Sequence, residues 1–198
     1  MRILPVNCEA HYQREFLSVE ESDALFEELV ESYNVTDLVI RMADGTEVVG
    51  EVGAYMFADT ELTSFEQLPE VWGGRSPWPQ SLAAIRDRIE ATTGTRYQVA
   101  RAIYYADGAH GMDFHRDLPA YGPTCPIASI SLGAEREFVF RPLDPSERNY
   151  SLVLKKGSLL VMGKFCQERY EHGVPRSSAD IGPRINLTFR KFDSGSDR

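Results

Sequence analysis

Two histidines and an aspartate have the residue types and the spacing of a metal centre. His115 and Asp117 are separated by one residue, and His172 follows Asp117 by 55 residues. Side chains alternate along a β-strand, so His115 and Asp117 are expected on the same side of a strand. Two imidazoles and one carboxylate make the facial triad of a non-haem Fe(II) centre, which leaves coordination positions open for reactants. A surface histidine beside a solvated aspartate would give the same local pattern.

A second set of polar residues alternates along residues 184–190. Arg184, Asn186, Thr188 and Arg190 share one face of a predicted strand, and the three residues between them are apolar. Arginines on the interior face of a barrel would be costly unless anions neutralise them. Arginine suits a bidentate grip on a carboxylate, and two arginines suit a dicarboxylate. The alternative is a plain strand whose arginines lie in water.

Two helices are predicted in the N-terminal half. Ser18 and Glu21 form a capping-box pattern, and leucines at helical spacing follow, so the pattern predicts an amphipathic helix over residues 19–32. A second helix is expected to start at Ser81 and to end at Gly94.

The remaining elements are expected to be a hairpin and an all-β half. Residues 35–41 and 46–52 are β-rich and flank an Asp-Gly turn, which predicts a hairpin. Residues 53–80 are expected to be irregular. From residue 97 onward, short strands suggest a sandwich or jelly roll. These predicted strands cover residues 97–105, 126–132, 137–143, 150–156, 158–162 and 184–192.

Length and composition indicate one globular domain. The chain has 198 residues, of which 42% are apolar, enough to bury a core. No apolar run approaches the ~20 residues of a membrane span, and the N-terminus lacks the apolar centre of a secretory signal. Cys8, Cys125 and Cys166 form no CxxC pair. We therefore expect a reducing, cytoplasmic location, or a nuclear one in a eukaryote.

The charge is unevenly distributed. The chain has a net charge of −9, made of −11 over residues 1–99 and +2 over residues 100–198. This balance argues against a protein that coats nucleic acid by bulk electrostatics. Any anionic ligand is expected to be held by the C-terminal half.

Over roughly residues 78–192, the sequence resembles the AlkB family of Fe(II)/2-oxoglutarate dioxygenases. Further local matches are Tyr105-Ala-Asp-Gly108, Pro126-Ile-Ala-Ser-Ile-Ser-Leu-Gly133 and Arg136-Glu-Phe-Val-Phe140, and the branch that acts on duplex DNA is the most similar. The family's order of site motifs is matched by His115, Asp117, His172, Arg184, Asn186, Thr188 and Arg190.

The resemblance implies a fold, a set of cofactors and a set of roles. The fold would be mainly β within the α+β class, a double-stranded β-helix, or jelly roll, with N-terminal helices and a hairpin or lid region. One catalytic domain would span residues 1–198: helices and lid over 1–96, the β-helix core over 97–192 and a flexible tail over 193–198. The cofactors would be Fe(II), 2-oxoglutarate and O2. His115, Asp117 and His172 would bind iron; Tyr105 and Arg184 would hold the distal carboxylate of 2-oxoglutarate; Asn186 and Arg190 would assist near the chelating carboxylate.

The resemblance also implies oxidative dealkylation of N-alkylated nucleic-acid bases, in DNA or RNA. We expect a monomer with no membrane association. Two positions depart from the family pattern. Ile103 stands where the family usually has an Asn, and Leu118 stands where repair members often have an acidic residue that reads a base's amine. A leucine cannot accept that hydrogen bond. The same chemistry on a small molecule or a protein side chain therefore stays open.

Four further groups of residues have two interpretations each. Asp113 lies two residues before His115 and could support the metal ligands, or lie free at the surface. Arg136 is expected either to reach the co-substrate region or to pair with Glu135 or Glu137. Aromatic residues of the expected lid, Tyr55, Phe57 and Phe65, could stack on a base, although packing in the core is the commoner fate. The last group is basic and could either meet nucleic acid or form a solvated face: Arg141, Arg148, Lys155, Lys156, Lys164 and Arg169.

Overall fold

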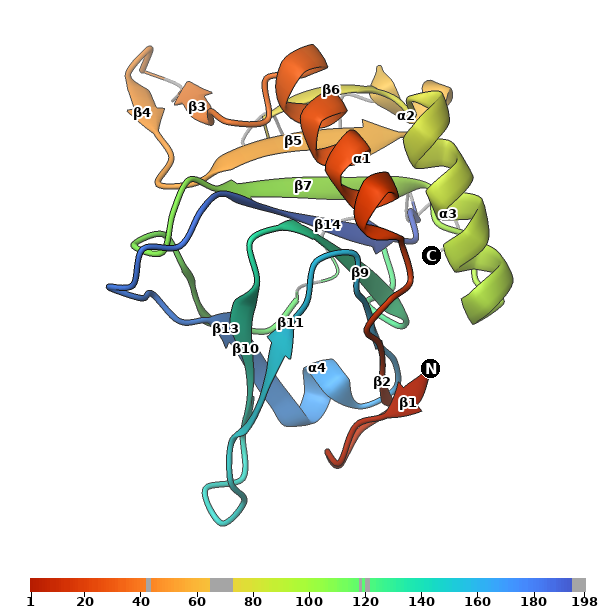
Figure 1. Ribbon diagram of the computed structural model, residues 1–198, viewed down its shortest axis with the longest axis vertical. Coiled ribbons are helices and arrows are strands. Elements are labelled where there is room, and N and C mark those ends of the chain that lie inside the picture. The colour runs from red at the N-terminus through yellow and green to blue at the C-terminus, as the bar shows by residue number, and fades with distance from the viewer. Residues whose placement is uncertain (42–43, 65–72, 118, 120–121, 194–198) are drawn as a thin grey trace.

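The computed structural model describes residues 1–41, 44–64, 73–117, 119 and 122–193. Within them, two β-sheets face each other and helices cover the outer face of the larger one (Figure 1). The larger sheet has the strand order β1-β2-β12-β9-β14-β7-β5-β6. Its strands are β1 (Arg2–Ile3), β2 (Ala10–Gln13), β5 (Gly53–Ala58), β6 (Gly74–Pro77), β7 (Val99–Tyr105), β9 (Ile127–Gly133), β12 (Leu159–Met162) and β14 (Arg184–Arg190).

The smaller sheet has the order β11-β10-β13-β8 and is antiparallel throughout its described pairs. Its strands are β8 (Met112–His115), β10 (Arg136–Pro142), β11 (Tyr150–Leu154) and β13 (Tyr170–Val174). The chain passes between the sheets repeatedly after β7, as in a jelly roll. The predicted mainly-β jelly-roll fold is therefore confirmed.

The two long helices lie where the sequence predicts them. Helix α1 (Val19–Ser32) starts at a complete capping box, in which Ser18 Oγ accepts from the Glu21 amide and the Glu21 carboxylate accepts from the Ser18 amide. Helix α3 (Gln80–Thr93) ends at Gly94, whose φ of 66° is in the left-handed region that glycine tolerates. Short helices are α2 (Thr60–Thr63) and α4 (Cys166–Arg169). Among the described helices, none has the length and hydropathy needed to cross a membrane.

Strand β14 separates two buried environments. Its apolar residues Ile185, Leu187 and Phe189 pack with residues of α1 and α3 in one core cluster. Its polar residues face the space between the sheets, where a second cluster joins β10 and β11 to the inner face of β12. Neither face of β14 exposes its arginines to water. The alternative of a plain strand with solvated arginines is therefore wrong.

Residues 53–80 are more regular than the sequence predicts. Strand β5 pairs antiparallel with β7 and parallel with β6, and it lies inside the larger sheet. Five of its six residues are buried. Because both faces of β5 are covered, its residues show no alternation of apolar and polar types, and a sequence pattern cannot reveal the strand. The expected hairpin is present as β3 (Val39–Arg41) and β4 (Glu47–Val49), with shorter strands than predicted.

The N-terminal segment is attached to the edge of the larger sheet. Strand β2, which the sequence analysis does not predict, pairs with β12. Just before it, the thiol of Cys8 lies 2.7 Å from that of Cys166 at the start of α4. The flexible tail is predicted over residues 193–198. Only Asp193 belongs to the described residues, and 194–198 lie outside them.

Removing the cap of α1 should destabilise the protein. Ser18→Ala leaves the Glu21 amide without its partner, and such changes cost about 1 kcal/mol. Denaturant unfolding of wild type and variant should show that difference in the free energy of unfolding. Ser151→Ala, an exposed serine in β11, is the control and should change little. Equal stabilities of Ser18→Ala and wild type would contradict the role of the capping box.

Candidate active site

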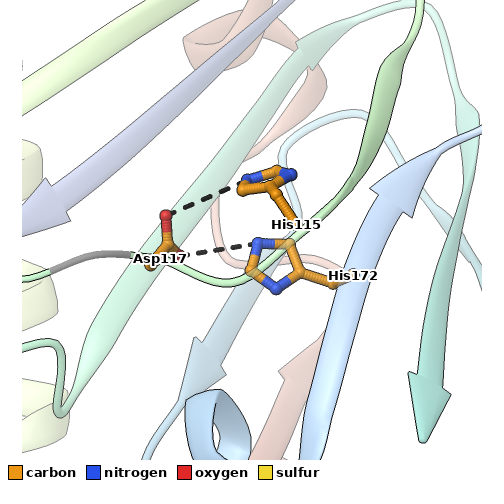
Figure 2. A group of neighbouring side chains, drawn as sticks. All are labelled: His115, Asp117 and His172. Atoms are coloured by element: carbon orange, nitrogen blue, oxygen red, sulfur yellow. Dashed lines mark ion pairs between the residues drawn. The ribbon is translucent and has the colours of Figure 1, made fainter. Parts of the chain in front are cut away.

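His115, Asp117 and His172 converge at one end of the smaller sheet (Figure 2). His115 is the last residue of β8 and lies opposite His172 of β13 in the strand register. Asp117 reaches the pair with Oδ1 4.0 Å from His115 Nε2 and Oδ2 3.5 Å from His172 Nε2. One ligand atom from each residue lies within 4.8 Å of the others. This group can hold a metal ion, as the sequence predicts.

One detail of that prediction is wrong. Strand β8 ends at His115, so Asp117 approaches from the following loop and does not share a strand face with His115. Although Asp117 lies in a loop, its carboxylate still points toward both imidazoles, as the predicted strand alternation would have placed it.

Backbone contacts fix the orientation of His115. Its Nδ1 lies 2.8 Å from the carbonyl oxygen of Asp113. A carbonyl can only accept, so Nδ1 carries a proton, and Nε2 is the ring nitrogen that faces Asp117. Asp113 therefore supports a candidate ligand through its main chain, while its carboxylate pairs with Arg176 at 2.7 Å.

Burial keeps His172 in the form that binds metals. Its side chain is 7% exposed, and desolvation lowers the pKa of His172 to about 4, against the opposing effect of Asp117. A neutral imidazole is the metal-binding form. Phe138 stacks on this ring, with ring centroids 5.5 Å apart, and holds its plane.

Asp117 is held by two residues besides the histidines. Gln167 of α4 is buried, accepts a hydrogen bond from the Asp117 amide at 2.8 Å and donates to Oδ2 at 3.5 Å. Arg190 donates from Nη2 to Oδ1. The sequence analysis did not identify Gln167. It carries no spacing signal, since its role arises from the packing of α4 against the loop after β8.

Arg184 lies at the other end of the same space and is 1% exposed. Its Nη2 donates to Ser131 Oγ at 3.1 Å and to Asn186 Oδ1 at 3.0 Å. Its Nε and Nη1 are buried and have no hydrogen-bond partner in the described structure. Tyr105 lies beside it, with the guanidinium carbon 5.2 Å from the ring centroid. Burial lowers the pKa of Arg184 and raises that of Tyr105.

This arrangement fits a carboxylate. Buried donors without acceptors are costly, and a guanidinium is best satisfied by a bidentate oxyanion. Asn186 completes the supporting row, because its Oδ1 also accepts from Ser129 Oγ at 2.8 Å and its Nδ2 donates to Thr188 at 2.8 Å. A cavity of about 390 Å³ joins Arg184 to the three metal-type ligands.

Other predicted residues have different surroundings. Arg136 does not line the cavity or pair with Glu135 or Glu137, but it lies behind the proposed co-substrate residues, with its guanidinium carbon 6.0 Å from the Tyr105 ring centroid. It donates to carbonyl oxygens of Asp107, Gly108, His110 and Pro175. It thereby ties β10 to the loops around β8 and β13. Ile103 is buried in the cavity wall. Leu118 lies outside the described residues.

The aromatic residues of the expected lid have mainly structural surroundings. Phe57 is fully buried in the core under the helices, and Tyr55 packs against that core. Tyr33 of the loop after α1 contacts both rings. Tyr55 and Phe57 therefore pack with the core, whereas Phe65 lies outside the described residues.

The match to known proteins extends over most of the chain. Residues 9–190 match the 2OG-Fe(II) oxygenase superfamily. The chain belongs to this superfamily. Its members use Fe(II), 2-oxoglutarate and O2, which agrees with the ligand set and the buried arginine. The predicted resemblance to AlkB-type oxygenases is confirmed.

Individual relatives within the superfamily cover part of the chain. Human DNA oxidative demethylase ALKBH2 is 37% identical over 124 residues, which are 59% of this chain and 48% of that protein. Mouse alpha-ketoglutarate-dependent dioxygenase alkB homolog 3 is 37% identical over 123 residues, which are 57% of this chain and 43% of that protein. The chain therefore spans about half the length of the curated relatives that it matches.

The solved structure of OsALKBH1 is similar with a TM-score of 0.63. The superposition covers 95% of this chain and 100% of that one at 16% sequence identity. At that identity the likeness shows the shared fold alone.

Substituting Gln167 should weaken metal binding without unfolding the protein. Gln167→Leu removes both contacts to Asp117 and keeps the side chain's size. Loss of such support for a ligand typically costs about 10- to 100-fold in metal affinity. Titration with Mn(II) measures it, and Glu168→Ala, an exposed neighbour, is the matched control. An affinity equal to wild type in folded Gln167→Leu would contradict this role.

The low pKa of His172 should make the metal-free protein sensitive to acid. The unfolded chain protonates this histidine near pH 6.5, whereas the folded protein does so only near pH 4. The stability that depends on neutral His172 is therefore complete above about pH 6.5 and is lost as pH falls toward 4. Relative to His172→Gln, wild type should lose about 2 kcal/mol of unfolding free energy from pH 7 to pH 5. Parallel pH profiles would be inconsistent with a buried neutral histidine.

Proposed function

We propose that this protein is an Fe(II)/2-oxoglutarate-dependent dioxygenase whose iron ligands are His115, Asp117 and His172. The observation that carries the proposal is the shared cavity, in which this triad lies at one end and a half-satisfied buried guanidinium at the other. Tyr105 and Arg184 would hold the distal carboxylate of 2-oxoglutarate. Asn186 and Arg190 would assist near the carboxylate that chelates iron, while Asn186 also braces Arg184 and Arg190 also holds Asp117.

When bound together, Fe(II), 2-oxoglutarate and O2 supply an oxidant that hydroxylates a substrate carbon and release succinate and CO2. The protein's part is to place and isolate these reactants. His115 and His172 would present ring nitrogens, Asp117 would present a braced carboxylate, and coordination positions would remain open for the reactants. Ile103, Phe138, Leu160 and Met162 give the cavity apolar walls that exclude water.

The proposed reaction is oxidative dealkylation of N-alkylated nucleic-acid bases by a monomer with a single catalytic domain over residues 1–198. Hydroxylation of an N-methyl carbon gives a product that breaks down to formaldehyde and the free amine. Support comes from the relatives named DNA oxidative demethylase, which are 36 to 38% identical in the mammals compared.

A second candidate is the same chemistry on a small molecule or a protein side chain. The acidic N-terminal half favours it, because described residues 44–64 contain five acidic residues and no Lys or Arg. Two of the five are paired, Glu51 with Arg176 and Asp59 with Arg86. Several of the basic residues that could meet nucleic acid are engaged with acidic partners. These pairs are Arg141–Glu171, Lys155–Glu135 and Lys156–Asp23.

Arg184 variants test the co-substrate assignment. Charged hydrogen bonds contribute about 1.5–3 kcal/mol each, so Arg184→Ala should raise the KM for 2-oxoglutarate roughly tenfold or more. The dependence on Fe(II) should change far less. Arg184→Lys should rescue poorly, since the planar fork is lost. Succinate release measures these effects, with His115→Ala as the inactive control; an unchanged KM in Arg184→Ala would remove this residue from the site.

A succinate-release screen tests the substrate class. The panel contains methylated single- and double-stranded oligonucleotides, methylated nucleosides and methylated small molecules. A nucleic-acid substrate should give turnover that falls steeply with salt, because released counterions drive binding to phosphates. Turnover that does not vary with salt would support the second candidate. Absence of succinate under all conditions would contradict the dioxygenase assignment.

A further inference from the structure

Arg101 occupies the middle of β7 and faces the same cavity as the site described above. In the strand register it lies opposite Thr188 of β14 and opposite Met56 of β5. Alternation places Arg101, Ile103 and Tyr105 on the cavity side of β7, and all three line the cavity. Ala100 and Ala102 point the other way, into the core under the helices.

Arg101 differs from Arg184 and Arg190, the two other cavity arginines that are not exposed, in having no fixed partner; Arg116 is exposed. Arg184 is held by Ser131 and Asn186, and Arg190 is paired with Asp117. Within the described chain, Arg101 Nε is buried without a hydrogen bond, and the guanidinium forms no ion pair. A cation in this position is stable only if an anion or water satisfies its donors.

The cavity is strongly positive in a chain that is negative overall. Its described lining contains Arg101, Arg116, Arg184 and Arg190 but, among carboxylates, only Asp117, which gives a net charge of +3. The whole chain carries −9. Fe(II) and the doubly charged 2-oxoglutarate would cancel each other. The loaded cavity therefore keeps its positive charge, and a further anion is favoured there.

The location of Arg101 points to the substrate. Arg184 lies opposite Tyr105 in the register, four residues along the strand pair from the Thr188–Arg101 position. At ~3.3 Å per residue, these positions are about 13 Å apart. Arg101 also borders β5, whose chain leads into the acidic α2 segment and away from the proposed 2-oxoglutarate end. It is thus a cation of the cavity that forms no hydrogen bond or ion pair with Asp117, Tyr105 or Arg184 in the described structure.

We propose that Arg101 binds an oxyanion, a carboxylate or a phosphate, which the substrate carries close to the group that is oxidised. This inference rests on the proposed dioxygenase function. It makes Arg101 a residue that selects anionic over neutral substrates. A guanidinium suits both oxyanions, because its fork can donate to two oxygens at once.

The test measures the equilibrium binding of probe ligands to protein that is loaded with 2-oxoglutarate and with Mn(II) in place of Fe(II). Each of two probe pairs has one member with the oxyanion and one without it: an N-methylated nucleoside 5′-monophosphate with its nucleoside, and an N-methylated amino acid with its amide. Wild type should bind the anionic member of at least one pair roughly tenfold more tightly, as expected for a charged hydrogen-bonded contact. Calorimetry gives the dissociation constants without turnover.

Arg101→Leu should abolish that preference and leave the KM for 2-oxoglutarate and the Mn(II) affinity within about twofold of wild type. Arg148→Leu removes the same charge from an exposed loop position and is the matched control. Thermal unfolding checks that the Leu variant is folded, and Arg101→Gln replaces it if it is not. A preference in the nucleotide pair identifies a phosphate, and a preference in the amino acid pair identifies a carboxylate.

Two results would overturn the proposal. One is the absence of any Arg101-dependent preference in both pairs while wild type still binds 2-oxoglutarate and releases succinate. The other is a large rise in the KM for 2-oxoglutarate in Arg101→Leu, which would place Arg101 with the co-substrate. Failure of the proposed function would look different, since wild type would then neither bind 2-oxoglutarate nor yield succinate.

Discussion

The buried carboxylate of Asp117 is the point at which the separate parts of this fold meet. It receives Arg190 from the larger sheet, Gln167 from α4 and the imidazoles of His115 and His172 from the smaller sheet. An anion in a poorly solvated place must have its charge and its lone pairs satisfied, or it is strongly destabilising. The two sheets can therefore pack in only the few registers that bring those partners to Asp117, and the metal-type geometry follows from the same packing.

Charge is arranged differently inside and outside the barrel. Outside, cations of the C-terminal half form exposed pairs with acidic residues, such as Arg141 with Glu171 and Lys155 with Glu135. Exposed pairs of this kind contribute little stability. Inside, arginines gather on the polar face of β14 and β7, where the field is less screened. The net charge of −9 thus says little about the ligand, because the reacting groups experience the cavity and not the average surface.

Features that depend on local pattern could be predicted from the sequence. The capping box and leucine spacing located α1, and the alternation from Arg184 to Arg190 located β14. The three candidate ligands were also predicted, since their types and order are distinctive. Strand β5 could not be found, because a strand buried on both faces has no alternation to detect.

Features that depend on tertiary packing could not be predicted. Gln167 reaches Asp117 only because α4 packs beside the loop after β8. Asp113 acts through its carbonyl, which no side-chain pattern records. Arg136, whose neighbours in sequence suggested a salt bridge, is instead satisfied by four backbone carbonyls contributed by two loops.

The unsatisfied donors of Arg184 link the supply of ligand to the stability of the folded state. This side chain lies within the packed interior, so its unpaired donors are costly, and the proposed binding of a dicarboxylate there would relieve that cost. A ligand that binds only the folded state raises its stability with the logarithm of the ligand's concentration. For an oxygenase that takes such a dicarboxylate, a fall in its cellular level would slow turnover and also increase the fraction of unfolded chains exposed to proteases.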